Sequence, residues 1–515
     1  MKNKIYLILL FPFLIYSHSN AQISYPLSSD YCLPFEDILL NNKALHINIK
    51  PVKASLNSKI QLIDSIYGKS SDIKIYNSSN FRVRVNPIIQ SSYLIKNEIY
   101  IHEAVGFQID AEVRNHFSLF LNYAANIIDN KPFKNTRLDS ANLMNHWGKT
   151  YKISNTLSFF NQFTGSLNFN ANKYLSFQIG NDKHFFGDGY RSLFLSDNSA
   201  PYLFFSTTLE FWKIKYVNQV LLLRDYSIGK KYTSTTTKYA AMHMLSWNAL
   251  KRINISLFEA VIWQSKDSTG AQRSFDLHYL NPFLAFRPVE YNLGSPDNML
   301  IGAATRVQVL KSTYCYSQIL FDEFYLKEML SGSDWWANKY AIQFGLKTYK
   351  FIGIKNMFFQ SEINITRPFT YGHTYTFQNY GYLLQPLAHP QGANFKEILI
   401  RSSYQKNKWT LNLTANLLTY GMEQAGAKSF GSDIYISSNN RIIRNKADNG
   451  NYIGQGIPSK EINNEFKIGR ILNPRWGLIA EAGITNKLII KPTRQSDLMF
   501  TFGIKTWLYN DQKLF

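Results

Sequence analysis

Apolar and polar residues alternate over several long stretches of this chain. Residues 163–169 read FTGSLNF, so that Phe, Gly, Leu and Phe occupy every second position and Thr, Ser and Asn lie between them. The same alternation runs through 175–179, 409–417 and 498–504. A period of two places the apolar side chains on one face of a β-strand and the polar ones on the other. The pattern therefore predicts strands with one apolar and one polar face.

These predicted strands are about 10–15 residues long, which exceeds the five or six of a usual soluble sheet and suits a tilted span of a bilayer. After the first 21 residues the sequence contains no apolar run of 18 residues, so no transmembrane helix is predicted. Outer-membrane barrels hide their apolar character in such alternation. The expected fold class is all-β, a single antiparallel transmembrane β-barrel.

The connections between the predicted strands fall into a short and a long class. Short ones lie near 114–115, 172–173, 212–213, 251–252, 311–312, 351–352, 407 and 473–474. Long ones lie at about 129–153, 182–200, 226–236, 265–297, 328–336, 370–394 and 422–460. Because outer-membrane barrels have short periplasmic turns and longer external loops, the two classes should lie at opposite ends of the barrel.

An up-and-down path through these connections gives about 18 strands. They start near 81, 98, 115, 156, 174, 201, 213, 237, 253, 298, 313, 337, 355, 395, 409, 461, 476 and 496. An even number leaves both chain ends in the periplasm. The strand-like stretch 275–286 is not counted, because a span there would move the later short turns outside. Residues 265–297 are therefore expected to form one long external or inward-folded loop.

The chain begins with the layout of a secretory signal peptide. Two lysines precede an apolar run from Ile5 to Tyr16, and a small-residue exit predicts cleavage after Ala21. The last residue, Phe515, suits a terminal strand offered to the barrel-assembly machinery, although the clean alternation stops near Leu508.

Residues 22–79 lack the alternation of the later chain. Short helices are expected at 33–40 and 56–67, with Ser55 and Asn57 as plausible starts. The predicted organisation is a signal peptide (1–21), a small N-terminal periplasmic, partly helical plug or cap (22–79) and the barrel (80–515).

The chain carries 56 Lys and Arg against 35 Asp and Glu, a formal net charge of +21. For an exported chain this balance favours acidic polysaccharide or anionic lipid headgroups as partners, with a merely soluble basic surface as the competing interpretation. Nucleic acid is not expected, because no nucleic-acid-binding module is recognisable. Two cysteines, Cys32 and Cys315, allow one disulfide at most and make no disulfide framework.

One stretch stands out for its polar and glycine-rich composition. FFGDGYRSLFLSDNSAP (185–201), leading into YLFFSTTLEF, resembles the signature of the Wzi-type capsule-assembly outer-membrane proteins. Later blocks are similar to the branch of the gliding-motility protein RemB. They are HYLNPFLAFRPVEYNLGSPDN (278–298), FDEFYL (321–326), WWANKYAIQFGLK (335–347), EINITRPFTYGHT (362–374) and QPLAHPQGANFKE (385–397).

The resemblance covers about 80–510 and does not extend to 22–79 or to the polar loop 422–460. It implies an eighteen-stranded outer-membrane barrel with a periplasmic helical element, which acts in retaining polysaccharide at the cell surface and is not an enzyme. Outer-membrane lipid and a surface polysaccharide are the partners it implies.

The polar residues of these blocks fall in the long connections or at their edges, which the topology places at one rim. Aromatic faces, amides and carboxylates recognise sugar rings and hydroxyls, and Arg and Lys add charge-assisted bonds to an acidic polymer. The candidate ligand-binding residues are Lys183, His184, Asp188, Tyr190, Arg191, Asp197, Asn198, Asp297, Asn298, Trp336, Asn338, Arg367, Tyr371, His373, His389 and Asn394.

Structural roles compete with binding at each of these positions. Gly187 and Gly189 also suit a tight turn with positive φ, and Asp188 and Arg191 also suit a pair that pins the loop. Trp335, next to Trp336, also suits the aromatic girdle of a barrel. The stretch 182–200 is expected to be a rigid loop over or inside the barrel mouth.

Catalysis and cofactors have little support in the sequence. Possible catalytic groups are His243 with Ser246, Asp322 with Glu323, and the histidines at 278, 373 and 389, but none has a spacing that demands chemistry. No metal-ligand spacing is present, so neither a metal nor a cofactor is expected. Because eighteen strands are wide enough for an aqueous channel, a porin is the second function that the sequence allows.

Overall fold

The structure is a computed structural model. It describes residues 22–41, 46–78, 80–114, 116–129, 131, 136–226, 235–266, 272–281, 283, 297–443 and 448–508. The predicted signal peptide and the terminal Phe515 lie outside these residues.

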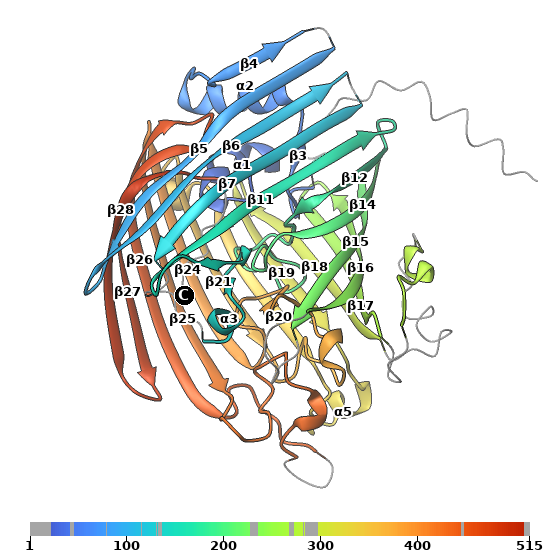
Figure 1. The fold of residues 1–515 in the computed structure, drawn as a ribbon. Helices are drawn as coiled ribbons and strands as arrows, with labels where there is room; N and C mark the ends of the chain where they lie inside the picture. Colours follow the sequence, from blue (N-terminus) through green and yellow to red (C-terminus); the bar gives the residue numbers. More distant parts are fainter. Residues whose placement is uncertain are drawn as a thin grey trace, which may run out of the picture.

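An antiparallel barrel of 18 strands forms the body of the molecule (Figure 1). The main sheet has 20 strands, of which the short strands β4 and β10 are extensions, and the barrel closes where β28 pairs with β5. The barrel strands are β5 (Phe81–Ile95), β6 (Ile99–Val113), β7 (Phe117–Asp129), β11 (Leu157–Asn170), β12 (Leu175–Asp182), β14 (Tyr202–Phe211), β15 (Ile214–Tyr226), β16 (Thr235–Leu250), β17 (Ile253–Gln264), β18 (Asn298–Leu310), β19 (Thr313–Phe321), β20 (Tyr340–Thr348), β21 (Met357–Thr366), β24 (Phe395–Lys406), β25 (Trp409–Met422), β26 (Ile457–Asn473), β27 (Leu478–Lys491) and β28 (Gln495–Thr506). Each start lies within four residues of its predicted position.

Shorter elements lie before the barrel and in its loops. The helices are α1 (Ser29–Asn41), α2 (Leu56–Tyr67), α3 (Thr136–Ser140), α5 (Leu326–Leu330), η3 (Leu277–Leu280), η4 (Phe351–Gly353), η5 (Thr376–Gln378) and η6 (Ser438–Asn440). The short strands are β1 (Ile23–Ser24), β2 (Ile49–Lys50), β3 (Lys53–Ala54), β4 (Lys74–Asn77), β8 (Leu143–Met144), β9 (Gly148–Lys149), β10 (Tyr151–Lys152), β13 (Phe185–Phe186), β22 (Gly381–Tyr382) and β23 (Gln385–Pro386). No helix of the described chain is long and apolar enough to cross a membrane.

The alternation predicted from sequence is the inside and outside of the barrel wall. Leu167 is 47% exposed on the outer face, whereas its neighbours Ser166 and Asn168 are buried on the inner face. In β28, Leu498, Phe500, Phe502 and Ile504 are likewise exposed. A continuous apolar outer face of this kind suits lipid and not water, and it supports an outer-membrane location.

Aromatic rings form a row across neighbouring strands of this outer face. Phe169 of β11 stacks on Phe117 of β7 at 4.9 Å and on Phe177 of β12 at 6.4 Å between ring centroids. Phe177 in turn stacks on Phe205 of β14 at 6.3 Å. Offset stacked rings attract each other beyond the area they bury, so the row stabilises the registers of four strands.

The two classes of connection lie at opposite ends, as predicted. Several hairpin turns at one end, the tight-turn end, have a non-glycine residue with positive φ: Arg114, Trp212, Ser312, Ile352 and Asn407. Tight hairpin turns need such a conformation to match the twist of the strands. The opposite end, the loop end, carries all the long connections, but it also has tight turns at 96–98 and 492–494 that the prediction did not assign to either class.

Residues 22–78 form the N-terminal segment at the tight-turn end, where α2 and β4 lie at the top of Figure 1. Both predicted helices are present, and Ser55 caps α2 by accepting a hydrogen bond from the Ser58 backbone N–H. Tyr31 and Phe35 of α1 pack with Tyr67 of α2 and with Trp507 after the last strand. The helices therefore fold against the barrel interior and its end.

The connection between β17 and β18 adds no strand to the barrel, as predicted, and its described part does not fold inward. Phe275 and Tyr279 pack on Trp263, with ring centroids 5.4 and 4.7 Å apart. Trp263 has the outward parity of the exposed Leu257. The segment therefore lies against the outer face of the wall.

The strands under this segment are apolar on both faces. Val261 of β17 is buried beneath the segment, while Phe258 and Met242 are buried on the lumenal side against Phe194 of the inward-folded loop. A strand that is buried on both faces has apolar residues at nearly every position, so its sequence does not alternate. This explains why 239–263 shows little alternation.

We expect an arginine on the outer face to destabilise the barrel in a way that depends on the direction of the side chain. Leu413→Arg places the charge in lipid and should lower the free energy of unfolding by about 2–4 kcal/mol. Denaturant titration of the protein refolded in lipid vesicles measures this. Asn412→Arg, one residue away and facing the lumen, is the control. It should lower the free energy of unfolding by less than half as much. Equal losses for the two variants would contradict the assigned parity.

Candidate functional site

The connection 183–201 folds into the barrel. Its backbone is held by inward-pointing amides of the wall. Gln318 of β19 donates to the Phe186 carbonyl at 3.1 Å and accepts from the Leu193 N–H at 2.8 Å. Gln343 of β20 donates to the Arg191 carbonyl at 3.0 Å. Buried backbone groups that leave the sheet are thus satisfied by the wall.

The two glycines of this loop share one requirement, and Gly187 has a second one. Gly187 has φ 155°, and a Cβ there would lie 2.6 Å from the Gln318 side chain. Gly189 has no positive φ, and its Cβ would lie 2.5 Å from the Glu362 carboxylate. Close approach to the wall is therefore the shared requirement, whereas positive φ applies only to Gly187.

Two wall carboxylates hold the turn of the loop. Glu362 of β21 accepts hydrogen bonds from the backbone N–H groups of Tyr190 and Arg191 at 2.8 and 3.1 Å. Glu397 of β24 lies 3.4 Å from the Arg191 guanidinium and 2.8 Å from His389 Nε2. Charge-assisted bonds of this kind are about twice as strong as neutral ones, so this end of the loop is rigid.

Asp188 and Arg191 do not pair with each other. Arg306 of β18 binds the Asp188 carboxylate at 2.6 Å, and Lys347 of β20 donates to the Asp188 carbonyl at 2.9 Å. Arg191 pairs with Glu397. Each residue therefore pins the loop to the wall, in place of the mutual pair considered from sequence.

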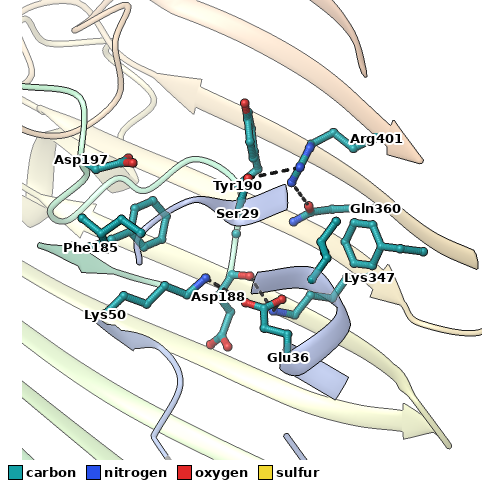
Figure 2. A pocket seen from close by; sticks show the side chains of 14 residues that line it. Ser29, Glu36, Lys50, Phe185, Asp188, Tyr190, Asp197, Lys347, Gln360 and Arg401 are labelled. Carbon is teal, nitrogen blue, oxygen red and sulfur yellow. Dashed lines mark hydrogen bonds and ion pairs between the residues drawn. The ribbon is translucent and has the colours of Figure 1, made fainter. Parts of the chain in front are cut away.

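The inner end of the loop meets helix α1 of the N-terminal segment (Figure 2). Glu36 of α1 accepts from Lys50 at 2.8 Å and lies 3.9 Å from Lys347, the lysine that binds Asp188. These cations hold the pKa of Glu36 well below its usual range, against the opposing effect of burial. The cavity left at this junction is about 20 Å³, the space of one water molecule.

Arg401 of β24 completes the junction. Its guanidinium lies 4.0 Å from the centroid of the Tyr190 ring and binds Asp30 of α1, with Gln360 on its other side (Figure 2). The backbones also pair, since β2 of the N-terminal segment and β13 of the loop form a two-stranded antiparallel sheet. Segments from the two ends of the barrel therefore meet inside it.

A larger cavity of about 840 Å³ lies between this junction and the loop end. Four long connections, the turn at 96–98 and the last strands of the barrel contribute to it. The lining side chains used below are Lys96, Arg137, His146, Arg191, Asn198, Gln385, Gln391, Tyr420, Glu423, Asp433, Tyr435, Lys487, Ile489, Asp497 and Met499. Its volume is within the range of small-molecule sites.

Most charged groups around this cavity are in ion pairs, and Glu423 accepts hydrogen bonds from the backbone N–H groups of Phe430 and Ser432. Arg137 binds Asp433 through two contacts, one of them 2.9 Å. Lys96 lies 2.7 Å from Asp497, and Lys487 lies 3.2 Å from Glu461. Paired charges keep their positions without a ligand, so the lining is preorganised for polar contacts.

The structure places the sequence-predicted residues in several groups. Arg191 and Asn198 line the larger cavity, and Asp188, Tyr190 and Asp197 line the junction with α1. All the predicted residues except Tyr190 and Trp336 are buried, which means that most of them contact the protein itself.

The remaining members of the set make contacts within a loop, between loops or between a loop and the wall. Lys183 lies over the Trp147 ring, and Gln219 donates to His184. Asp297 binds Arg273 and Tyr279, and Asn298 donates to the Gln378 carbonyl. Trp336 stacks on Arg441, Asn338 accepts from Tyr325 N–H, and Arg367 binds Asp334. Tyr371 donates to the Leu193 carbonyl, His373 accepts from Tyr375 N–H, His389 binds Glu397, and Asn394 donates to the Gln455 carbonyl.

Trp335 packs among the loops. Its ring contacts Tyr325 and Trp336, with ring centroids 6.4 and 6.1 Å apart. These neighbours belong to the connection between β19 and β20 and not to the outer face of a strand.

Most of the cavity lining has no distinctive sequence pattern, and it was not predicted. Lys96, Arg137 and Lys487 are examples. Lys96 and Lys487 lie near the loop ends of strands and Arg137 lies in α3 of a long connection, and many residues in such positions do not line the cavity.

The pairs considered for catalysis do not form a triad. His243 has the outward parity of β16, whereas Ser246 faces the lumen and contacts His46 at 2.8 Å. Asp322 follows the end of β19 and accepts from the Tyr371 N–H, while Glu323 pairs with Lys339. In the described chain no three His, Cys, Asp or Glu side chains group to hold a metal ion, and Cys32 and Cys315 are free thiols.

Buried histidines lie around the inward-folded loop. Burial lowers the pKa of His184 to about 3, and the Lys53 charge adds to the effect. Burial also lowers the pKa of His46 to about 3 and of His373 to about 4, with nearby cations again contributing. Each imidazole is therefore neutral at physiological pH.

The sequence matches no protein-family model and no curated protein sequence. Among solved structures, the fold is similar to Wzi of Escherichia coli, described as an outer-membrane protein involved in group 1 capsule assembly and a carbohydrate-binding β-barrel. The two chains are 13% identical, the alignment covers 94% of this chain and 98% of Wzi, and the TM-score is 0.55. OprD of Pseudomonas aeruginosa is 8% identical, with 82% and 94% coverage and a TM-score of 0.43. The likeness to Wzi shows a shared barrel fold.

We expect acid to loosen the inward-folded loop through His184. Since its pKa is about 3 in the folded protein and near 6.5 when unfolded, the unfolded state binds more protons between these values. Stability is therefore full above about pH 6.5 and falls as the pH is lowered. His184→Gln should reduce the loss between pH 7 and pH 4 by roughly 2–3 kcal/mol, measured by denaturant titration in detergent.

Tyr202→Phe is the matched control for this variant. It removes the hydroxyl that accepts from the His184 backbone N–H at 3.2 Å but leaves the imidazole in place. Its stability should fall at every pH, with the wild-type dependence on pH. If the free energy of unfolding of His184→Gln fell with pH as steeply as that of the wild type, the imidazole would not titrate as described.

Proposed function

We propose that this chain is a non-enzymatic outer-membrane barrel that binds or organises a surface polysaccharide. The observation that carries the proposal is the cavity of about 840 Å³ at the loop end. Between this cavity and the tight-turn end, the loop and α1 fill the interior. In this proposal the loop end faces the outside of the cell and the tight-turn end faces the periplasm, with residues 1–21 as the export signal.

The chemistry of the cavity suits sugars. Gln385, Gln391 and Asn198 supply amides, Tyr420 and Tyr435 supply rings with hydroxyls, and the surrounding charges are fixed by ion pairs. Amides and carboxylates bind hydroxyl groups, and aromatic faces contact the C–H side of sugar rings. Arg191 and Lys487 add the charge-assisted bonds that an acidic polymer would use.

The filled interior supports binding over transport. Between the cavity and the tight-turn end, the wall, the loop and α1 are joined by ion pairs such as Asp188–Arg306 and Glu36–Lys347, and the space at the junction holds about one water. A polymer held at the loop end would therefore stay at the cell surface. Wzi of similar fold is described as carbohydrate-binding, in agreement with this proposal.

The physiological role follows from the sequence resemblance stated above. Retention of a capsule and gliding motility, as in the RemB-like branch, are the two processes in which such a barrel would act. Deletion of the gene should change polysaccharide retention or surface movement, and unchanged behaviour in both assays would remove the proposal.

We expect neutral variants in the cavity to weaken polysaccharide binding. Arg191→Gln and Lys487→Gln each remove a charged donor and should reduce affinity about tenfold or more for polysaccharide extracted from the producing bacterium, measured by calorimetry. Affinity of the wild type should fall as salt rises, because partly exposed charges are screened. Lys311→Gln, an exposed charge at the tight-turn end, is the matched control and should bind like the wild type.

A channel for solutes is the second candidate, favoured by the width of an eighteen-stranded ring. Planar-bilayer recording distinguishes the two functions. The filled interior leads us to expect no sustained open conductance from the wild type. Stable open steps, together with absent polysaccharide binding, would favour the channel.

A further inference from the structure

The seam where the barrel closes is short. β28 pairs with β5 only from Phe500, opposite Ile95, to Lys505, opposite Gln90. Its pairing with β27 on the other side extends from Thr506 to Gln495. The β27–β28 hairpin thus projects past the end of β5 at the loop end.

This mismatch leaves a notch in the wall. Within the described chain, Gln495–Met499 pairs with β27 alone, because β5 ends at Ile95 and turns at 96–98. Leu498, in the middle of this edge, points outward and is 50% exposed, so the notch begins at the level of the apolar band. An unpaired strand edge is costly in hydrocarbon, which places the notch at the boundary between acyl chains and headgroups.

Side chains, and not backbone pairs, close the notch. Lys96 Nζ lies 2.7 Å from Asp497 Oδ1, and both side chains are partly exposed. Beneath them Leu94, Tyr100 and Met499 form a small apolar cluster. A partly exposed ion pair contributes about 0–1 kcal/mol, so separating it costs little compared with breaking a row of backbone hydrogen bonds.

The notch and the larger cavity share residues. Lys96, Asp497 and Met499 line the cavity from the side of the seam, together with Lys487 and Ile489 of β27. Ile489 and Met499 therefore give the cavity an apolar wall surface at the notch, with Lys96 and Lys487 beside it. Elsewhere the cavity is lined by Met422 of β25 and by the loops, which contribute amides, tyrosines and ion pairs as well as the apolar side chains of Leu138, Leu384 and Ile434.

We propose that the ligand of this cavity is a lipid-anchored glycan that enters sideways through the notch. The sugar portion lies in the cavity while the acyl chains remain in the outer leaflet, since each buried CH₂ holds them there by about 0.8 kcal/mol. Lys96 and Lys487 suit an anionic group, such as a phosphate, between the two portions. This inference rests on the proposed function and names the class of its ligand.

A reversible cross-link across the notch tests the route. Lys96→Cys and Asp497→Cys are combined with Cys32→Ser and Cys315→Ser, and the two new thiols are bridged by a short bis-methanethiosulfonate. The probes are the surface glycolipid fraction of the producing bacterium and the same fraction after acid removal of its acyl chains. Retention of the heat-modifiable folded form on gels shows that the bridged protein is intact.

We expect the bridge to weaken glycolipid binding at least tenfold relative to the same protein after reduction, while the deacylated glycan binds both forms alike. Unchanged glycolipid binding in the bridged form would overturn sideways entry and leave the proposed function standing. Absence of binding to either probe by the wild type would overturn the proposed function itself.

A second bridge controls for a merely stiffened barrel. Ile95→Cys and Phe500→Cys replace a directly paired couple on the closed part of the seam, and neither residue lines the cavity. A disulfide there should leave glycolipid binding intact. An equal loss of glycolipid binding with both bridges would show that the notch is not the entry route.

Discussion

The structure depends on one constraint, the closure of a ring of backbone hydrogen bonds. In lipid no water is present to satisfy the N–H and C=O groups of a strand edge, so a sheet is stable only when its first and last strands pair. Closure fixes which side chains face outward, and it explains why Leu167 and Leu413 are exposed while Asn168 and Thr410 are buried. The seam meets this constraint only in part, because β28 pairs with β5 from Phe500 to Lys505 and not at Gln495–Met499.

Closure by eighteen strands also creates an interior wider than wall side chains alone can fill. This chain fills it with its own loop and α1, and the wall supplies the polar partners. Gln318, Gln343 and Glu362 each bind backbone of the loop, so a segment without strand pairing has its backbone groups satisfied. Most residues chosen from sequence as ligand contacts instead hold this loop and its neighbours in place. A binding loop and an internally bonded loop both require polar, glycine-rich sequence, so the sequence alone does not distinguish them.

The barrel could be predicted from sequence because its determinants are local. Alternation and turn residues located every strand start within four residues, and Ser55 was recognisable as a helix cap from its own neighbours. The site was harder because its partners are distant in the chain. Asp188 meets Arg306, 118 residues away, and Glu36 meets Tyr349, 313 residues away. The side of the wall taken by the segment over Trp263 was left open for a related reason, since apolar sequence on both faces of β17 does not say which face a later loop covers.

The inward-folded loop connects the larger cavity with the junction at α1. Arg191 lines the larger cavity, while Asp188, three residues earlier in the same rigid loop, lies at the junction with α1. Arg401 contacts both Tyr190 and Asp30, so the loop and α1 share a wall residue. Glu362 binds the loop backbone at Tyr190 and Arg191, between these two places. The loop is therefore one continuous, internally bonded element from the larger cavity to α1, and the same packed contacts support both.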